Sequence, residues 1–237
     1  MKKSISRRTF VTSAAAGAAA IGAFGAIQPP ARAQLVYTTA NWKVSDFDAV
    51  AKNPARIKQV FEVTQINEGG FLNNIKNSLN GLHFGFGIPA DQIKIVAALH
   101  GPPNMLNYDD FLWSKYKLGE FLKIDDPATS QPAVKNPYYP SKTGLKYATE
   151  DPDSRDSLYQ DMSLQALLHR GVQLLSCHTA TEEQVRGLMK HNNRSGDPEP
   201  IVREFLAHTI PGVLVVPAMV AAVALLQIEG HYAYNKV

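Results

Sequence analysis

The stretch GVQLLSCHTATEEQ, residues 171–184, changes character at its middle. Its first seven residues form a short apolar run, of the length of a buried strand, that ends at Cys177. The polar residues after it include Thr181, a plausible helix N-cap, and two glutamates that suit the first turn of a helix. The stretch therefore predicts a strand, a turn and a helix in succession, with the only cysteine of the chain at the turn.

Three similar apolar runs occur elsewhere in the sequence, two before this stretch and one after it. They are QVFEVTQI at residues 59–66, IKIVAALHG at residues 93–101 and GVLVVP at residues 212–217. Each run is rich in Val, Ile or Leu, as strands covered by helices on both faces are. We expect each of them to be a strand.

The segments between these runs show apolar residues at helical spacing. Helices are expected within residues 68–87, 158–171, 181–192 and 217–230, and three of these segments end at or near a glycine. Alternating strands and helices favour an α/β fold with an open, mainly parallel sheet and helices on both faces. Residues 123–155 interrupt this alternation with five prolines and no helical pattern, which predicts a long insertion over the surface.

The N-terminus carries the three parts of a twin-arginine export signal. A basic start contains Arg7 and Arg8 within SRRTFV, a weakly apolar run rich in Ala and Gly spans residues 10–27, and the Ala-Arg-Ala of residues 31–33 forms a cleavage site. We therefore expect a signal peptide at residues 1–33. The expected localisation is periplasmic, with no membrane anchor after cleavage.

Loss of residues 1–33 changes the charge of the protein. The full chain has 24 basic and 21 acidic residues, but five of the basic and none of the acidic ones lie in the signal. The mature chain thus has 19 basic residues, a balance of −2. Because nucleic-acid binding needs a concentrated basic surface, no nucleic-acid partner is expected. Residues 34–237 are 204 residues, enough for one core, and are predicted to form a single domain.

The lone cysteine limits the chemistry of an exported protein. In an oxidising compartment cysteines usually pair, yet Cys177 has no partner in its own chain. It is therefore buried and inert, joined to another molecule, or a free reactive thiol. Twin-arginine export often accompanies a preloaded cofactor, but no motif names one, so the cofactor is unknown.

The order of these pieces resembles the DsrE/DsrF-like family of sulfur-relay proteins. The matching pieces are FLNNIKNSLNGL, IVAALHG, LLHRGVQLLSC and the tail VLVVPAMVAAVALLQIEGHYAYNKV. The resemblance covers residues 59–237 apart from the insertion. It implies a small DsrE/F-like α/β domain with flavodoxin-like layering that often forms oligomers. It further implies that Cys177, at the position of the relay cysteine, carries persulfide sulfur exchanged with a donor or acceptor protein.

Cys177 and His100 both lie at the end of an expected strand. Ligands of open parallel sheets bind at these ends, so the two residues face one crevice if their strands are neighbours. We expect the helix N-terminus near Thr181 and a histidine, His100 or His178, to lower the pKa of an accessible Cys177 thiol. Cys177, His100 and His178 are therefore the candidate catalytic residues.

The opposite interpretation of these three residues stays open. Cysteine is among the most buried residue types, and a histidine before a Gly-Pro turn such as His100 can cap backbone groups without chemistry. The side chain of His178 can point away from Cys177 along a strand. The alternative function is a noncatalytic oligomeric module of the periplasm that binds a small ligand or a metal.

The sequence lacks the motifs of several other kinds of functional site. Histidines and Cys177 offer metal ligands, but none has a paired spacing, so no metal site is expected. Covalent haem, a nicotinamide cofactor and a nucleophile elbow are also disfavoured, because the sequence contains none of their motifs. Asp109 and Asp110 are interpreted as a helix-start pair rather than an acid/base dyad. The helix expected at residues 219–228 is apolar on nearly every face, which predicts a homo-oligomer.

Overall fold

The computed structural model describes residues 36–147, 149 and 151–237. The chain divides into two units, Met1–Ala31 and Arg32–Val237, and every described residue belongs to the second. The expected signal peptide at residues 1–33 lies outside the described residues.

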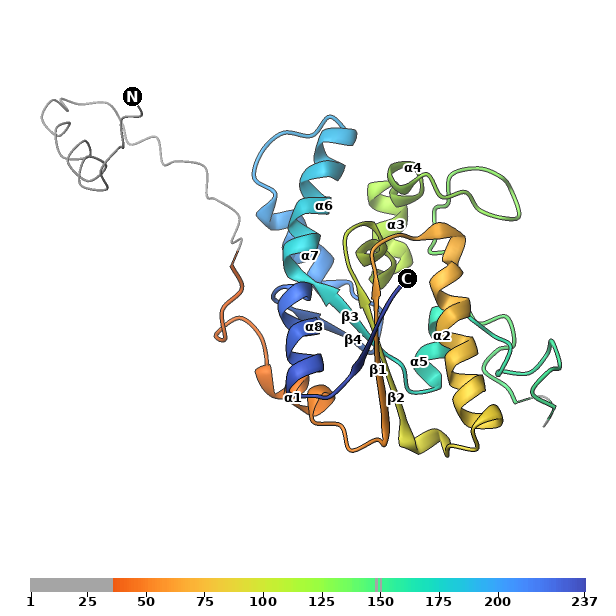
Figure 1. Ribbon diagram of the computed structural model, residues 1–237. Helices are drawn as coiled ribbons and strands as arrows, with labels where there is room; N and C mark the ends of the chain where they lie inside the picture. Colours follow the sequence, from red (N-terminus) through yellow and green to blue (C-terminus); the bar gives the residue numbers. More distant parts are fainter. Residues whose placement is uncertain (1–35, 148, 150) are drawn as a thin grey trace, which may run out of the picture. The chain divides into compact units, whose positions relative to one another are not determined.

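In the described part of the chain, five parallel strands form one sheet (Figure 1). They are β1 (Ile57–Val63), β2 (Ile93–Leu99), β3 (Gln173–Cys177), β4 (Val213–Val216) and β5 (Ala233–Lys236), in the order β4-β3-β2-β1-β5. The expected α/β fold and its four apolar strands are confirmed. The sequence reading missed β5, because this short edge strand is mostly exposed and has no apolar run.

Side chains of the strands alternate between two cores. Phe61, Ile95 and Leu99 belong to one core, whereas Val60 and Cys177 belong to the other. The first core is covered by α2 (Gly70–Asn80), α3 (Asp110–Tyr116), α4 (Leu118–Leu122), α5 (Leu164–His169), α6 (His178–His191) and α7 (Glu199–Ala207). The second is covered by α1 (Val44–Ala51) and α8 (Met219–Ile228). Figure 1 shows α1 and α8 on one side of the sheet and α2 and α5 on the other.

Two helices begin elsewhere than expected. The helix expected from residue 158 is only α5, because the Ser163 side chain caps it by accepting the Ala166 N–H, and residues before Ser163 form turns. The helix expected to be capped by Thr181 is instead capped by Cys177, four residues earlier, so that α6 begins at His178. Thr181 instead lies inside α6 and donates its hydroxyl to the Cys177 carbonyl.

The insertion at residues 123–155 contains no helix or strand at its described positions. It does more than pass over the surface, however, since Ala133 and Asn136 are buried. The Asn136 side chain donates to the Leu106 carbonyl at 2.8 Å, and Ala133 lies directly against Gly119 of α4. The insertion is thus held to the core at two points.

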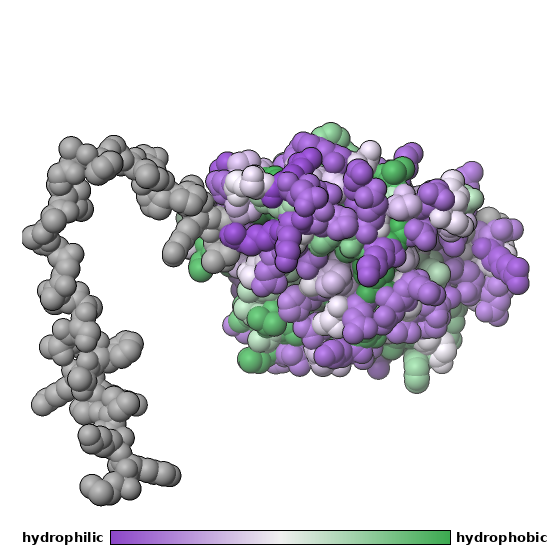
Figure 2. Space-filling model, turned by 90° about the horizontal axis from the view of Figure 1, so that it is seen from above, coloured by the Kyte–Doolittle hydropathy of each residue, from purple (hydrophilic) through white to green (hydrophobic). Residues whose placement is uncertain are grey.

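None of the described helices is long and apolar enough to span a bilayer. Figure 2 shows the molecule from above, with mostly hydrophilic residues and small apolar patches between them.

Candidate functional site

The carboxyl ends of neighbouring strands bring together most of the candidate residues. Strands β2 and β3 are neighbours, as the site hypothesis required. The His100 N–H donates to the Val63 carbonyl, which extends the ladder one residue beyond β2, and Leu99 pairs with Ser176. The next residues of the two chain segments, His100 and Cys177, therefore lie side by side. Because side chains alternate along a strand, both are on the face of the sheet that α8 covers.

The sulfur of Cys177 lies at the N-termini of two helices. Its Sγ accepts the N–H of Ala180 in α6 and the N–H of Met219, the first residue of α8, each at 3.3 Å. Pro217, between β4 and α8, is joined to α6, because its carbonyl accepts both the N–H and the hydroxyl of Thr179. Only 2% of the Cys177 surface is exposed.

Burial raises the pKa of the Cys177 thiol, and the N–H donors of Ala180 and Met219 only partly oppose this effect. The expectation of an accessible thiol with a lowered pKa is therefore wrong for this structure. The physical reason is the connection from β4 to α8, which covers the sulfur. Neither the length nor the path of that connection is evident from the sequence around Cys177.

A buried polar network holds the backbone of Cys177. Asn104, which follows β2, accepts the Cys177 N–H at 2.8 Å and the Ser176 hydroxyl at 3.0 Å, and it donates to the Thr181 hydroxyl at 3.0 Å. The Tyr108 hydroxyl lies 2.6 Å from the Thr181 hydroxyl. Asn104, Tyr108, Ser176 and Thr181 all have zero exposed surface. The network fixes where β3 ends and α6 begins.

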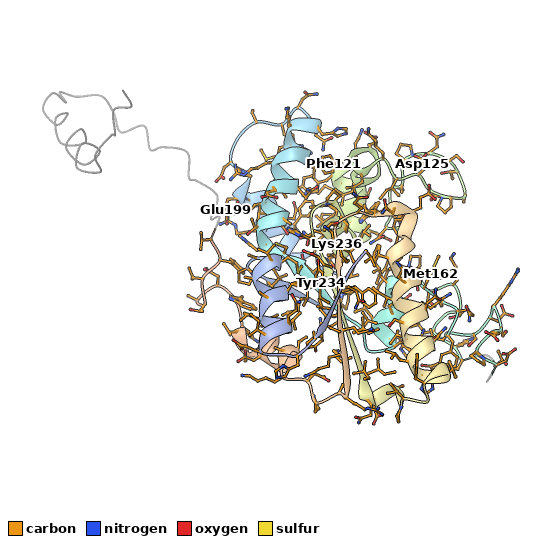
Figure 3. The ribbon with its side chains drawn as sticks, in the orientation of Figure 1. Phe121, Asp125, Met162, Glu199, Tyr234 and Lys236 are labelled. Atoms are coloured by element: carbon orange, nitrogen blue, oxygen red, sulfur yellow. The ribbon has the colours of Figure 1, made fainter. Side chains whose placement is uncertain are left out.

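The side chain of His100 lies near a carboxylate, and no hydrogen bond joins it to the thiol within the described residues. Its Nδ1 lies 3.6 Å from Oε1 of Glu62, and Oε2 of the same carboxylate accepts the Tyr234 hydroxyl at 2.5 Å. This hydrogen bond raises the pKa of Tyr234. Glu62 and Tyr234 were missed, although a charged residue inside an apolar strand was a usable signal for Glu62. Tyr234 and Lys236 of β5 are labelled in Figure 3.

His178 takes part in a separate cluster. Its ring stacks on Tyr37, with ring centroids 4.1 Å apart, and its burial lowers its pKa, so the ring is neutral near pH 7. One turn further along α6, burial raises the pKa of Glu182, whose carboxylate lies 3.6 Å from the Arg186 guanidinium and makes no hydrogen bond within the described residues. Among the described residues, no hydrogen bond joins His178 or His100 to the Cys177 sulfur. His178 therefore supplies no positive charge to the thiol.

Asp109 and Asp110 serve the start of α3, which confirms the helix-start interpretation. Asp109 is the N-cap, and its side chain accepts the Leu112 N–H at 3.2 Å. Its second oxygen lies 2.8 Å from Nδ1 of His208. The side chain of Asp110 accepts the Asn136 N–H and so helps to hold the insertion.

No group of three or more His, Cys, Asp or Glu side chains placed to hold a metal ion occurs in residues 36–147, 149 and 151–237. No protein-family model, no curated protein and no solved structure matches the chain.

Proposed function

We propose that the protein is a periplasmic carrier of persulfide sulfur that uses Cys177. The observation that carries this proposal is the position of the sulfur, which two helix N-termini approach with backbone N–H groups at 3.3 Å. A neutral thiol is a weak acceptor, whereas a thiolate or persulfide anion gains from N–H donors and from the partial positive charge of a helix N-terminus. The resemblance of the sequence to sulfur-relay proteins gives further support.

The transfer step needs a donor of the persulfide class. The Cys177 thiolate attacks the outer sulfur of a donor persulfide, R–S–S⁻. The S–S bond of the donor breaks, the donor leaves as the thiolate R–S⁻, and Cys177 then holds the outer sulfur as a persulfide. An acceptor thiolate removes that sulfur by the same exchange, so no external oxidant is required.

Access to Cys177 requires movement of the covering segment, Pro217 to Met219. Movement of this segment would remove the Met219 donor but leave the Ala180 donor, which belongs to α6. The desolvation that raises the pKa of the thiol would decrease as water enters. The closed structure thus corresponds to a protected thiol, and the open form to the reactive one.

Mass spectrometry of the protein after incubation with polysulfide tests this function. We expect additions of about 32 Da, one sulfur atom each, on the peptide that contains Cys177. The adducts should disappear on treatment with a reducing thiol and should be absent from Cys177→Ser. An unmodified Cys177, in a sample whose unfolded form reacts readily, would contradict the proposal.

A noncatalytic binding module is the second candidate, because Cys177 is only 2% exposed and its thiol is protonated near neutral pH. In that case Glu62, His100 and Tyr234 would form the ligand-facing groups at the strand ends, with Cys177 as packing beneath them. Under this alternative Cys177→Ser would leave ligand binding unchanged, whereas His100→Ala would weaken it.

We also propose that the protein forms a homo-oligomer through α8. Three large apolar side chains of this helix are exposed: Val220 at 63%, Leu225 at 41% and Ile228 at 73%. All three lie on the exposed face of the helix, whereas Ala222, Val223 and Leu226 form its buried face. Light scattering is expected to give a dimer or trimer, and Val220→Lys with Ile228→Lys should shift it to a monomer. A wild-type monomer throughout the micromolar range would exclude this interface.

A further inference from the structure

A small cavity lies beside Ile93, the first residue of β2, and so at the opposite end of the parallel strands from Cys177. Its volume is about 80 Å³, and its lining includes His83, Tyr147, Tyr159 and Arg170 together with apolar Leu79 and Ile93. These residues come from α2, the turn after it, the start of β2, and the segments on either side of α5. None of them takes part in the Cys177 site.

Arg170 brings to this cavity a positive charge that pairs with no carboxylate of the described residues. Its guanidinium donates to Oδ1 of Asn80 at 2.7 Å and to the Tyr159 carbonyl at 3.4 Å, and it lies 5.4 Å from the centre of the Tyr159 ring. All of these partners are neutral. Within the described residues no carboxylate pairs with Arg170, and burial lowers its pKa. A guanidinium carries five N–H donors, so several stay available.

The neighbouring polar groups also offer hydrogen-bond donors. Nδ1 of His83 lies 2.9 Å from the Ile88 carbonyl, which can only accept, so Nδ1 carries a proton. Nε2 of His83 is thereby left for another partner. The Tyr159 hydroxyl makes no hydrogen bond in the part of the chain that the structure describes, and its ring contacts those of His83 and Phe84.

The size of the cavity restricts the kind of ligand. A volume of about 80 Å³ equals that of roughly two or three water molecules in the liquid, whereas pockets for drug-sized ligands begin near 300 Å³. A small ligand that accepts hydrogen bonds and carries negative charge matches both the volume and the donors. Nucleotides and other extended anions are too large.

We propose that this cavity is a binding site for a small tetrahedral oxyanion, such as inorganic phosphate or sulfate, held mainly by Arg170. The bound anion accepts hydrogen bonds from the free guanidinium N–H groups and from the Tyr159 hydroxyl. The site is independent of the sulfur chemistry of Cys177.

Isothermal titration calorimetry with sodium phosphate and sodium sulfate tests the proposal, with sodium chloride as the control. We expect one saturable site for at least one of the two oxyanions and none for chloride. Arg170→Gln should weaken that binding at least about tenfold, since charge-assisted hydrogen bonds are lost. Arg203→Gln is the matched control, because the Arg203 side chain is 67% exposed and pairs with Glu199. The affinity of this variant for the oxyanion should equal that of the wild type.

Arg170 also connects α2 to the segment before α5, so Arg170→Gln is first compared with the wild type by circular dichroism. If that variant does not fold, Tyr159→Phe decides the test, because it removes only the hydroxyl and retains the ring contacts. Its expected effect is a several-fold loss of affinity. Absence of saturable binding for both oxyanions, or full affinity in the folded variants, would overturn the proposal.

Discussion

Replacing Asn104 with alanine is expected to lower the free energy of unfolding by about 3–5 kcal/mol. The side chain has zero exposed surface and makes hydrogen bonds to Cys177, Ser176 and Thr181. The substitution would leave the Cys177 N–H and the Ser176 hydroxyl buried with fewer partners, and it would also open a cavity. Urea denaturation followed by circular dichroism measures the change.

Asn74→Ala is the matched control for this substitution, because Asn74 is exposed in the middle of α2. We expect its effect to stay within about 0.5 kcal/mol, as alanine is the better helix former. A loss below about 1 kcal/mol for Asn104→Ala would show that the network does not hold the end of β3.

Gly119→Ala is expected to destabilise the protein by about 2–3 kcal/mol, at the upper range of overpacking. A Cβ atom at Gly119 would lie 2.3 Å from the Ala133 carbonyl oxygen and 2.4 Å from the Ala133 nitrogen. Both are backbone atoms, so the contact is relieved only by moving the insertion away from α4. Hydrogen exchange should show faster exchange of the Ala133 amide, which donates to the Ile124 carbonyl in the native structure.

The control for Gly119→Ala is Gly81→Ala, at the end of α2. Gly81 has helical backbone angles, and a Cβ atom there would meet no atom within 4 Å. This substitution should be neutral or slightly stabilising, because alanine loses less conformational entropy in a helix. Equal effects of the two substitutions would mean that the insertion does not pack tightly against α4.

The order of strands and helices was predictable because buried parallel strands need apolar residues on both faces. The runs that contain β1, β2, β3 and β4 meet that requirement, and each is a strand. β5 has the sequence Ala-Tyr-Asn-Lys and one exposed edge, so no apolar pattern marks it. Its pairing with β1 depends on tertiary contacts made by residues far apart in the sequence.

The helix beginnings were harder to predict because side-chain and backbone caps compete. Thr181 is a favourable N-cap residue, yet its hydroxyl belongs to the buried Asn104 network and the N-cap of α6 is Cys177, four residues earlier. Met219 approaches Cys177 only because β4 lies beside β3. Contacts of this kind follow from sheet order, which the sequence around Cys177 does not contain.

The proposed carrier role requires that Cys177 becomes reachable without unfolding of the whole protein. The rate of alkylation of Cys177 in the native protein, measured at neutral pH across low urea concentrations, tests this requirement most directly. We predict a native rate on the order of a hundredfold below that of the unfolded protein, and almost independent of urea, as a local opening of Pro217 to Met219 exposes little surface. A rate that rises steeply with urea in parallel with global unfolding, or a thiol that reacts only once the protein is unfolded, would contradict this role and leave Cys177 as a packing residue.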